Sequence, residues 1–450
     1  MQKKNILCHV VTFGCAALGS VANASAADAS VADDSLTWHG ITLYGTYSIG
    51  VAYQNHGAPL SEDMGQGIPY MLGKMNNKPE FTIAPNANGW SRIGVRGKET
   101  IIEGMDFVFN TEIGFQPQSG KLSDALASMV HNNGVPLNRQ TSSTDSSRAG
   151  QLFNGPAYGG ISTADFGTLT FGRQNTVATD LMYAYDPMDY AAAFSILGYS
   201  GVAGAIGYTE DRTYDASLKY AYKYNLFHLS AIYQPSKNDS QPGKGWQVGA
   251  GLDYGSFSAD AAYGKKNDAL SLASLSAAQV AAGLPINSLS ATVADTGGWV
   301  LGAKYDLDAW KLFGGYERIT YSNPSSPLAA GFAGLGGYWI SAISNTAFPH
   351  DKTLAVNWLG AKYFIARNFD ITAAWYHYDQ NSYGAKACSN TSDATCSGTE
   401  NIYSVRLDYR VTRRVDVYGG VSTVKLEDGL ANGYLNSSIY TPLVGFRFQF

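Results

Sequence analysis

Apolar and polar side chains alternate with a period of two along much of this 450-residue chain. In ITLYGTYSIGVAY, residues 41–53, apolar positions alternate with Thr, Ser and Gly. MDFVFNTEIGF (residues 105–115) and NIYSVRLDYRV (residues 401–411) repeat the pattern. Because side chains two apart share one face of a strand, each stretch predicts an amphipathic strand. A strand of about ten residues crosses a bilayer when it is tilted.

The alternation predicts sixteen strands, separated by connections rich in turn residues. They cover residues 38–53, 89–99, 105–116, 147–162, 167–174, 212–224, 226–234, 244–254, 256–265, 296–306, 309–321, 352–365, 368–379, 400–410, 414–424 and 438–450. Short connections alternate with long ones along this series, as at the two rims of an outer-membrane barrel. The expected fold class is therefore all-β, a 16-stranded antiparallel transmembrane β-barrel with an even strand number.

Composition separates this barrel from a soluble exported β-sandwich, which would also show alternation. Charged residues are only 15% of the chain against about 25% in ordinary domains, while the chain holds 30 Tyr and 50 Gly. Rings gather near the ends of the expected strands, as in an aromatic girdle at a membrane interface. The formal net charge of -5 and the absence of a basic run argue against nucleic-acid binding.

The N-terminus reads as a secretory signal peptide, residues 1–26. Lys3 and Lys4 precede an apolar core, and small residues allow cleavage after residue 24 or 26. Residues 27–450 then form a single barrel domain. The mature chain keeps two cysteines, Cys388 and Cys396, in a polar loop of an exported protein, which predicts a disulfide. No histidine or third cysteine shares that loop, so no metal site and no cofactor are expected.

Several stretches resemble the general porins of Gram-negative outer membranes. They include SRIGVRGKE (91–99), AYGGISTADFGTLTFGRQ (157–174), LKYAYKY (218–224), LDYRVTRRVDVYGG (407–420) and the terminal phenylalanine. Their order along the mature chain matches the family. The resemblance implies a homotrimer of barrels, each with a water-filled channel for passive diffusion of small hydrophilic solutes. It also implies contact with outer-membrane lipids and lipopolysaccharide, and recognition of Phe450 by the barrel assembly machinery.

In that family a long loop folds into the channel and faces its carboxylates toward basic wall residues. The matching segment here is residues 175–211, which carries Asp180, Asp186 and Asp189 as the expected constriction acids. The expected wall cations are those of the second strand and of the strand that follows the loop: Arg92, Arg96, Lys98 and Arg212. Opposed charges in a narrow passage set up a transverse field that acts on passing solutes.

Local alternatives remain beside these roles. Arg92 could balance Glu112 on the next strand, and Asp186 before Pro187 fits simple turn chemistry. A fourth-strand position that often carries a wall arginine is Gly155 here, and Arg148 could substitute for it. Arg406 and Lys304 fit general lining of the lumen.

Two other loops differ from the rest in composition, and the first and last strands are expected to pair. Residues 268–284 have helical composition and are expected to form a short surface helix. The apolar residues 328–343 are expected to fold over the channel mouth or to pack between subunits. The last strand should pair with the first strand near Leu43, which leaves the barrel no open edge.

The function expected from these observations is an outer-membrane diffusion porin without enzymatic activity. A substrate-specific porin is the alternative, because Phe332, Tyr338 and Trp339 could offer stacking surfaces to sugars. An outer-membrane barrel enzyme and an adhesin are further alternatives, although the chain lacks G-x-S-x-G, H-E-x-x-H, P-loop and dinucleotide motifs.

Overall fold

The computed structural model describes residues 36–63, 70–197, 212–235, 243–333, 337–384, 386–391 and 393–450. The predicted signal peptide and both of its cleavage sites lie outside the described residues. Residues 198–211, the second part of the predicted constriction loop, also lie outside them.

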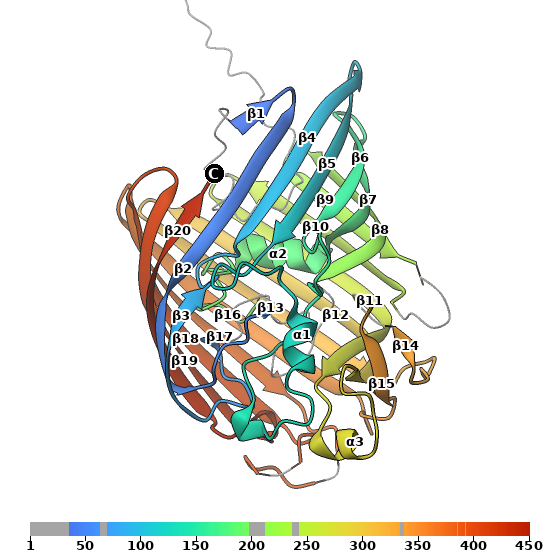
Figure 1. The fold of residues 1–450 in the computed structure, drawn as a ribbon. Helices are drawn as coiled ribbons and strands as arrows, with labels where there is room; N and C mark the ends of the chain where they lie inside the picture. Colours follow the sequence, from blue (N-terminus) through green and yellow to red (C-terminus); the bar gives the residue numbers. More distant parts are fainter. Residues whose placement is uncertain are drawn as a thin grey trace, which may run out of the picture.

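Sixteen strands form a closed antiparallel β-barrel, which confirms the predicted fold class (Figure 1). They are β2 (Ile41–Gly57), β4 (Arg92–Ile102), β5 (Met105–Gly114), β6 (Ala157–Thr163), β7 (Gly167–Asn175), β8 (Thr213–Tyr224), β9 (Phe227–Gln234), β10 (Gly245–Tyr254), β11 (Phe257–Ala273), β12 (Leu289–Leu307), β13 (Trp310–Ser322), β16 (Lys352–Ala366), β17 (Phe369–Gln380), β18 (Gly398–Arg410), β19 (Val415–Asp428) and β20 (Ser438–Gln449). Each pairs with the next along the chain, so local hairpins build the wall.

The barrel closes where β20 pairs with β2. Tyr47 lies opposite Phe448 in this ladder. The backbones of Gly45 and Phe450 exchange two hydrogen bonds, with N···O distances of 2.9 and 3.1 Å. The expected closure is therefore present, two residues along the first strand from the predicted Leu43.

The two faces of the wall differ in chemistry as the period-two pattern requires. On β18 the side chains of Tyr403, Val405 and Leu407 point outward and are exposed, with Tyr403 57% exposed. Arg406 and Asp408 alternate with them on the inner face and are buried. Apolar groups therefore face lipid, and charged groups are held inside the barrel.

Among the described residues, four short strands and three helices lie outside the sixteen barrel strands. They are β1 (Thr37–Trp38), β3 (Lys78–Pro85), β14 (Phe332–Ala333), β15 (Trp339–Ser344), α1 (Ala125–Val130), α2 (Val177–Tyr185) and α3 (Ala277–Ala281), with 3₁₀ turns at Leu137–Arg139 and Gly429–Ala431. β2 pairs with β4 over Ile41–Thr46 and with β3 over Ile49–Gly57. β3 thus takes the place of β4 beside the second half of β2. No helix within the described ranges is long and apolar enough to cross a membrane.

The structure corrects several predicted boundaries. The predicted strand 147–162 is wrong over residues 147–156, because β6 begins at Ala157. β11 runs on to Ala273 and β12 begins at Leu289, so both strands extend beyond their predicted ends. The stretch 268–284 holds the expected short surface helix as α3, none of whose residues is buried. The apolar residues 328–343 hold β14 and β15, and β15 pairs in parallel with the start of β12.

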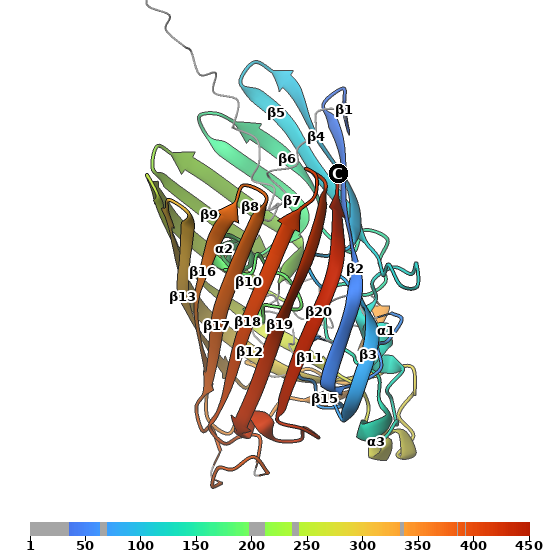
Figure 2. The same cartoon turned by 90° about the vertical axis from the view of Figure 1, so that its left-hand side faces the viewer.

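The connection between β5 and β6 packs on the extended β11–β12 hairpin. Figure 2 shows α1 and α3 together beside the barrel, at the end away from the C-terminus. Leu126 and Met129 of α1 lie in one apolar cluster with Leu272 of β11 and Phe332 of β14. The backbone N–H of Leu272 also donates to the buried carboxyl of Asp145, at 2.9 Å. Three long connections therefore form one packed layer at this rim.

Candidate functional site

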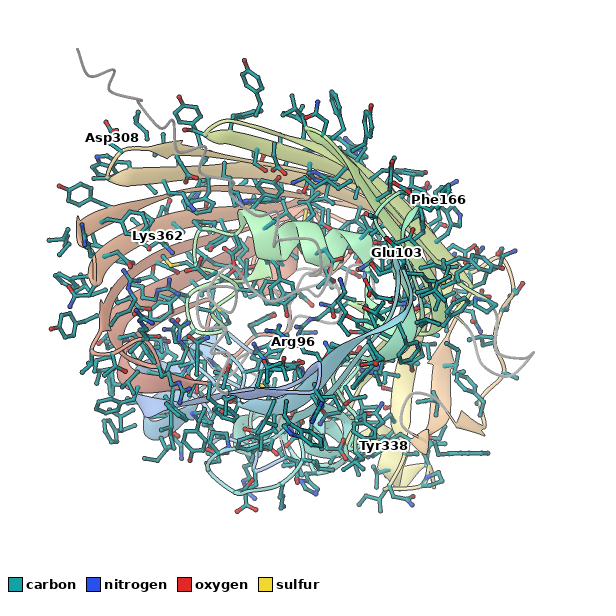
Figure 3. The ribbon with its side chains drawn as sticks, turned by 90° about the horizontal axis from the view of Figure 1, so that it is seen from above. Arg96, Glu103, Phe166, Asp308, Tyr338 and Lys362 are labelled. Carbon is teal, nitrogen blue, oxygen red and sulfur yellow. A yellow bond between two sulfur atoms is a disulfide. The ribbon has the colours of Figure 1, made fainter. Side chains whose placement is uncertain are left out.

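Helix α2 begins the segment that follows β7, and its residues contact strands β9 to β13. Figure 3, which looks along the barrel, shows α2 within the ring of strands. Thr176 caps the helix, because its hydroxyl accepts a hydrogen bond from the N–H of Thr179. At the other end, Trp358 of β16 donates its indole N–H to the carbonyl of Tyr185, at 3.0 Å. Both ends of the helix are thus held.

Wall glycines allow the segment to approach the strands closely. A Cβ atom on Gly360 of β16 would lie 2.3 Å from Cβ of Pro187, and one on Gly420 of β19 would lie 2.6 Å from the ring of Phe194. Both distances are shorter than real Cβ contacts allow. Phe194 and Met188 are fully buried in an apolar cluster that they share with Trp358 and other wall residues. The segment therefore packs on the wall as a protein core does.

Asp186 is buried and organises the turn after α2. Its carboxyl accepts the backbone N–H groups of Met188 at 3.1 Å and Tyr190 at 2.9 Å. It also accepts the hydroxyl of Tyr376 from β17, at 2.6 Å. Burial raises the pKa of Asp186 above its ordinary value, although the hydrogen bonds from Tyr376 and Met188 oppose the rise. These contacts fit the role in a turn that was considered for Asp186.

Asp189 joins the segment to two strands on the far side of the barrel. One carboxylate oxygen contacts Nζ of Lys362 at 2.7 Å and Nη2 of Arg406 at 2.6 Å. Burial opposes ionisation of this carboxyl, but the two cations hold the pKa of Asp189 well below its ordinary range. Arg406 is anchored further by Asn88, whose amide oxygen lies 2.9 Å from Nη1. Asp189 is therefore a charged bridge between the segment and the wall.

Asp180, the third predicted acid, lies in the first turn of α2. Its carboxylate forms an ion pair with Lys219 of β8. The same Lys219 ammonium donates to the carbonyl of Asn175 at the end of β7, at 2.9 Å. Each of the three predicted acids thus contacts a wall residue.

Two of the four predicted basic residues, Arg92 and Arg212, lie in one cluster. Nε of Arg92 lies 3.1 Å from a carboxylate oxygen of Glu112. Arg148, the considered substitute, contacts the other oxygen of Glu112 at 2.9 Å. The guanidinium of Arg212 stacks on the ring of Trp90, with Cζ 3.2 Å from the ring centroid, and Arg148 lies 5.0 Å from the same centroid. Three guanidinium groups therefore surround one indole and one carboxylate.

Arg96 and Lys98 are the other two predicted cations. Arg96 lies beside the ring of Tyr44, with Cζ 5.2 Å from the centroid. Lys98 is half-exposed and forms an ion pair with Asp106 at 2.9 Å, close to the turn between β4 and β5. The structure therefore places Lys98 toward one rim and away from the cluster around Trp90.

Sequence reasoning missed the aromatic members of that cluster and the partners of Asp189. The rings of Tyr183 and Tyr190 pack at a tilt of 39° with a centroid distance of 4.1 Å, and Tyr190 meets Trp90 edge to face at 5.7 Å. The spacing of rings in MYAYDPMDY, residues 182–190, was an available signal. The pairing of Asp189 with Arg406 had no local signal, since the two residues are 217 positions apart.

The remaining predicted features lie away from this region. Cys388 and Cys396 form a disulfide in the connection between β17 and β18, with Cα atoms 5.2 Å apart. Within the part of the chain that the structure describes, no group of three or more His, Cys, Asp or Glu residues could hold a metal ion.

Comparison with known proteins adds independent information. The family model described as Gram-negative porin matches residues 14–429. An outer membrane porin protein of Bordetella pertussis is 23% identical over 369 residues, which cover 78% of this chain and 80% of that protein. An anion-selective porin from Comamonas acidovorans has a similar fold, with a TM-score of 0.59, 15% identity, and coverage of 91% of this chain and 99% of that one. OmpT of Vibrio cholerae in its trimer form has a TM-score of 0.54 at 14% identity, with coverage of 91% and 99%.

Proposed function

Because this chain belongs to the Gram-negative porin family and forms an outer-membrane channel for passive diffusion, we propose that residues 176–197 narrow that channel. We propose further that the charges held at this segment select among small hydrophilic solutes and ions. The observation that carries the proposal is the bridge from Asp189 to Lys362 and Arg406. It fixes a segment that leaves the wall at β7 to the strands β16 and β18.

The second support is the gathering of cations on the other side of the segment. Arg92, Arg148 and Arg212 converge on Glu112 and Trp90, while the segment's own acids contact Lys219, Lys362 and Arg406. Guanidinium groups stay charged at all relevant pH values. A passing anion therefore meets a wall where positive groups converge, and the channel should prefer anions modestly.

The assembly we propose is a homotrimer, with one channel in each subunit. The porin fold supports this, since a neighbour of the same fold has been described in a trimer form. We propose that the barrel sits among outer-membrane lipids and lipopolysaccharide and is inserted by the assembly machinery through Phe450. No catalytic step is part of the proposal.

Planar-bilayer recording tests this function. Purified protein should insert as water-filled channels that close in three equal steps, and the reversal potential in a KCl gradient should have the sign of anion preference. If the membranes do not conduct, both the channel and its proposed constriction are refuted. If the channels close one at a time and not in groups of three, the trimer is refuted. Release of product from phospholipid would instead support the barrel enzyme.

A further inference from the structure

Five residues from four separate stretches form what we call the Trp90 cluster: Trp90, Arg148, Tyr183, Tyr190 and Arg212. Tyr183 belongs to α2 and Tyr190 to the turn after it, while Trp90 precedes β4 and Arg212 precedes β8. Trp90 and Tyr190 are each 6% exposed, whereas Tyr183 and Arg212 are half-buried. The cluster thus has a fixed base and a more accessible rim.

Flat groups dominate the geometry of the cluster. The guanidinium of Arg212 lies 3.2 Å from the centroid of Trp90, 5.0 Å from that of Tyr190 and 5.6 Å from that of Tyr183. Its Nη2 donates to the hydroxyl of Tyr183. Stacking of this kind holds a guanidinium plane in place, and a guanidinium carries five N–H donors along its edge.

The base of the cluster is pre-organised by hydrogen bonds. Arg148 donates to Asn154 at 2.8 Å and to Glu112 at 2.9 Å. The amide of Asn154 in turn donates to the carbonyl of Gly114 at 2.8 Å. These contacts fix Arg148 against Trp90 before any solute arrives. Pre-organisation of this kind reduces the entropy cost of binding.

One polar atom points to a ligand independently of the arginines. The indole Nε1 of Trp90 is buried and has no hydrogen-bond partner among the described residues. A buried N–H without an acceptor costs about 1–3 kcal/mol, so such groups usually find a partner. A solute oxygen would supply the missing acceptor.

We propose that the Trp90 cluster is a binding subsite for solutes that carry a carboxylate on a flat, conjugated body. The carboxylate oxygens would accept from the guanidinium edges, and the flat body would stack against the tyrosine rings. This inference rests on the proposed diffusion channel. It adds that the channel binds flat carboxylates more tightly than other small solutes. A compact inorganic anion would be attracted by the same positive charges, but it has no flat surface to stack on the rings, so it should bind more weakly.

Current block by three matched solutes tests the inference in wild-type channels. Benzoate is flat and anionic, cyclohexanecarboxylate is anionic with a puckered ring, and benzyl alcohol is flat and neutral. Benzoate should block chloride current with saturation at a concentration about tenfold below that of cyclohexanecarboxylate, and benzyl alcohol should not block. Equal block by the two carboxylates would overturn the inference while leaving the channel itself intact.

Two variants assign the effect to the cluster. Arg212→Lys keeps the charge but removes the flat guanidinium, so benzoate block, measured relative to the variant's own chloride current, should weaken about tenfold. Arg96→Lys makes the same exchange beside Tyr44, outside the cluster, and should leave benzoate block at the wild-type level. Should Arg212→Lys form no channels, Trp90→Phe keeps a ring without the N–H and should also weaken the block. Wild-type block in a variant that conducts normally would contradict the assignment.

Discussion

Replacing Asp189 by Asn removes one negative charge from the segment and leaves its size almost unchanged. In the wild type this carboxylate contacts Lys362 and Arg406, whose side chains are 13% and 2% exposed. After the exchange, both cations keep their charge and lose their shared counter-ion. The passage through the barrel should therefore become more attractive to anions and less attractive to cations.

The size of the effect follows from Coulomb's law. For an ion that passes about 10 Å from the lost charge through water, the interaction changes by about 0.4 kcal/mol. The change has opposite signs for chloride and potassium, so their permeability ratio should shift roughly threefold at 0.01 M salt, where the Debye length is about 30 Å. At 1 M salt the Debye length is about 3 Å and the shift should vanish.

Reversal potentials in planar bilayers measure this ratio directly. Asp306→Asn is the matched control, because Asp306 is a half-exposed carboxylate that pairs with Lys311 at the β12–β13 turn. The control should keep the wild-type ratio at both salt concentrations. Equal ratios for Asp189→Asn and wild type at 0.01 M would refute the view that the segment's charges act on passing ions.

Three further predictions follow from single contacts. Removing Phe450 deletes its two backbone hydrogen bonds to Gly45, so less protein should reach the outer membrane, while the channels that do insert should keep their conductance. Normal amounts of the variant in isolated membranes would count against both the β20–β2 closure and the assembly role of Phe450. Tyr376→Phe removes the hydroxyl that Asp186 accepts at 2.6 Å, which should cost about 1–3 kcal/mol and speed protease cleavage within residues 176–197; an unchanged cleavage rate would contradict this. Burial raises the pKa of Asp145 to about 7, so the folded loop binds more protons than the unfolded one and loses stability as pH rises from about 4 to about 7; the protection of the Leu272 amide against hydrogen exchange, corrected for the pH dependence of intrinsic exchange, should be lower at pH 8 than at pH 5, and Asp145→Asn should abolish this difference in protection.

The barrel could be predicted because its cause is periodic and local. Lipid on one side and polar groups on the other impose a period of two on every strand, and β18 shows it from Ile402 to Arg410. The errors fall where that cause is absent. Leu152 and Phe153 are neighbours and both exposed, so they cannot be alternating members of a strand, and Pro156 directly precedes β6. Short strands such as β3 and β15 exist through their partners on β2 and β12, which sequence alone does not reveal.

The candidate site was predictable in its residues but not in its pairings. The sequence identified Asp180, Asp186 and Asp189, but it could not show that their carboxylates make different kinds of contact. Asp186 accepts backbone N–H groups, as its place before Pro187 allowed, whereas Asp189 meets cations on strands far along the chain. Tertiary contacts of this kind depend on barrel register, and a shift by one residue exchanges inner and outer faces.

These contacts also determine how the segment should behave during conduction. Trp358 binds the carbonyl of Tyr185, Asp189 binds Arg406, and Phe194 is fully buried against the wall at Gly420. Moving the segment would expose that apolar core and separate buried charges, each at a cost of several kcal/mol. A voltage across the membrane supplies about 2.3 kcal/mol per elementary charge at 100 mV, which is less than that combined cost. Ion preference should therefore come from fixed charges on an immobile segment, and it should stay constant over this range of voltage.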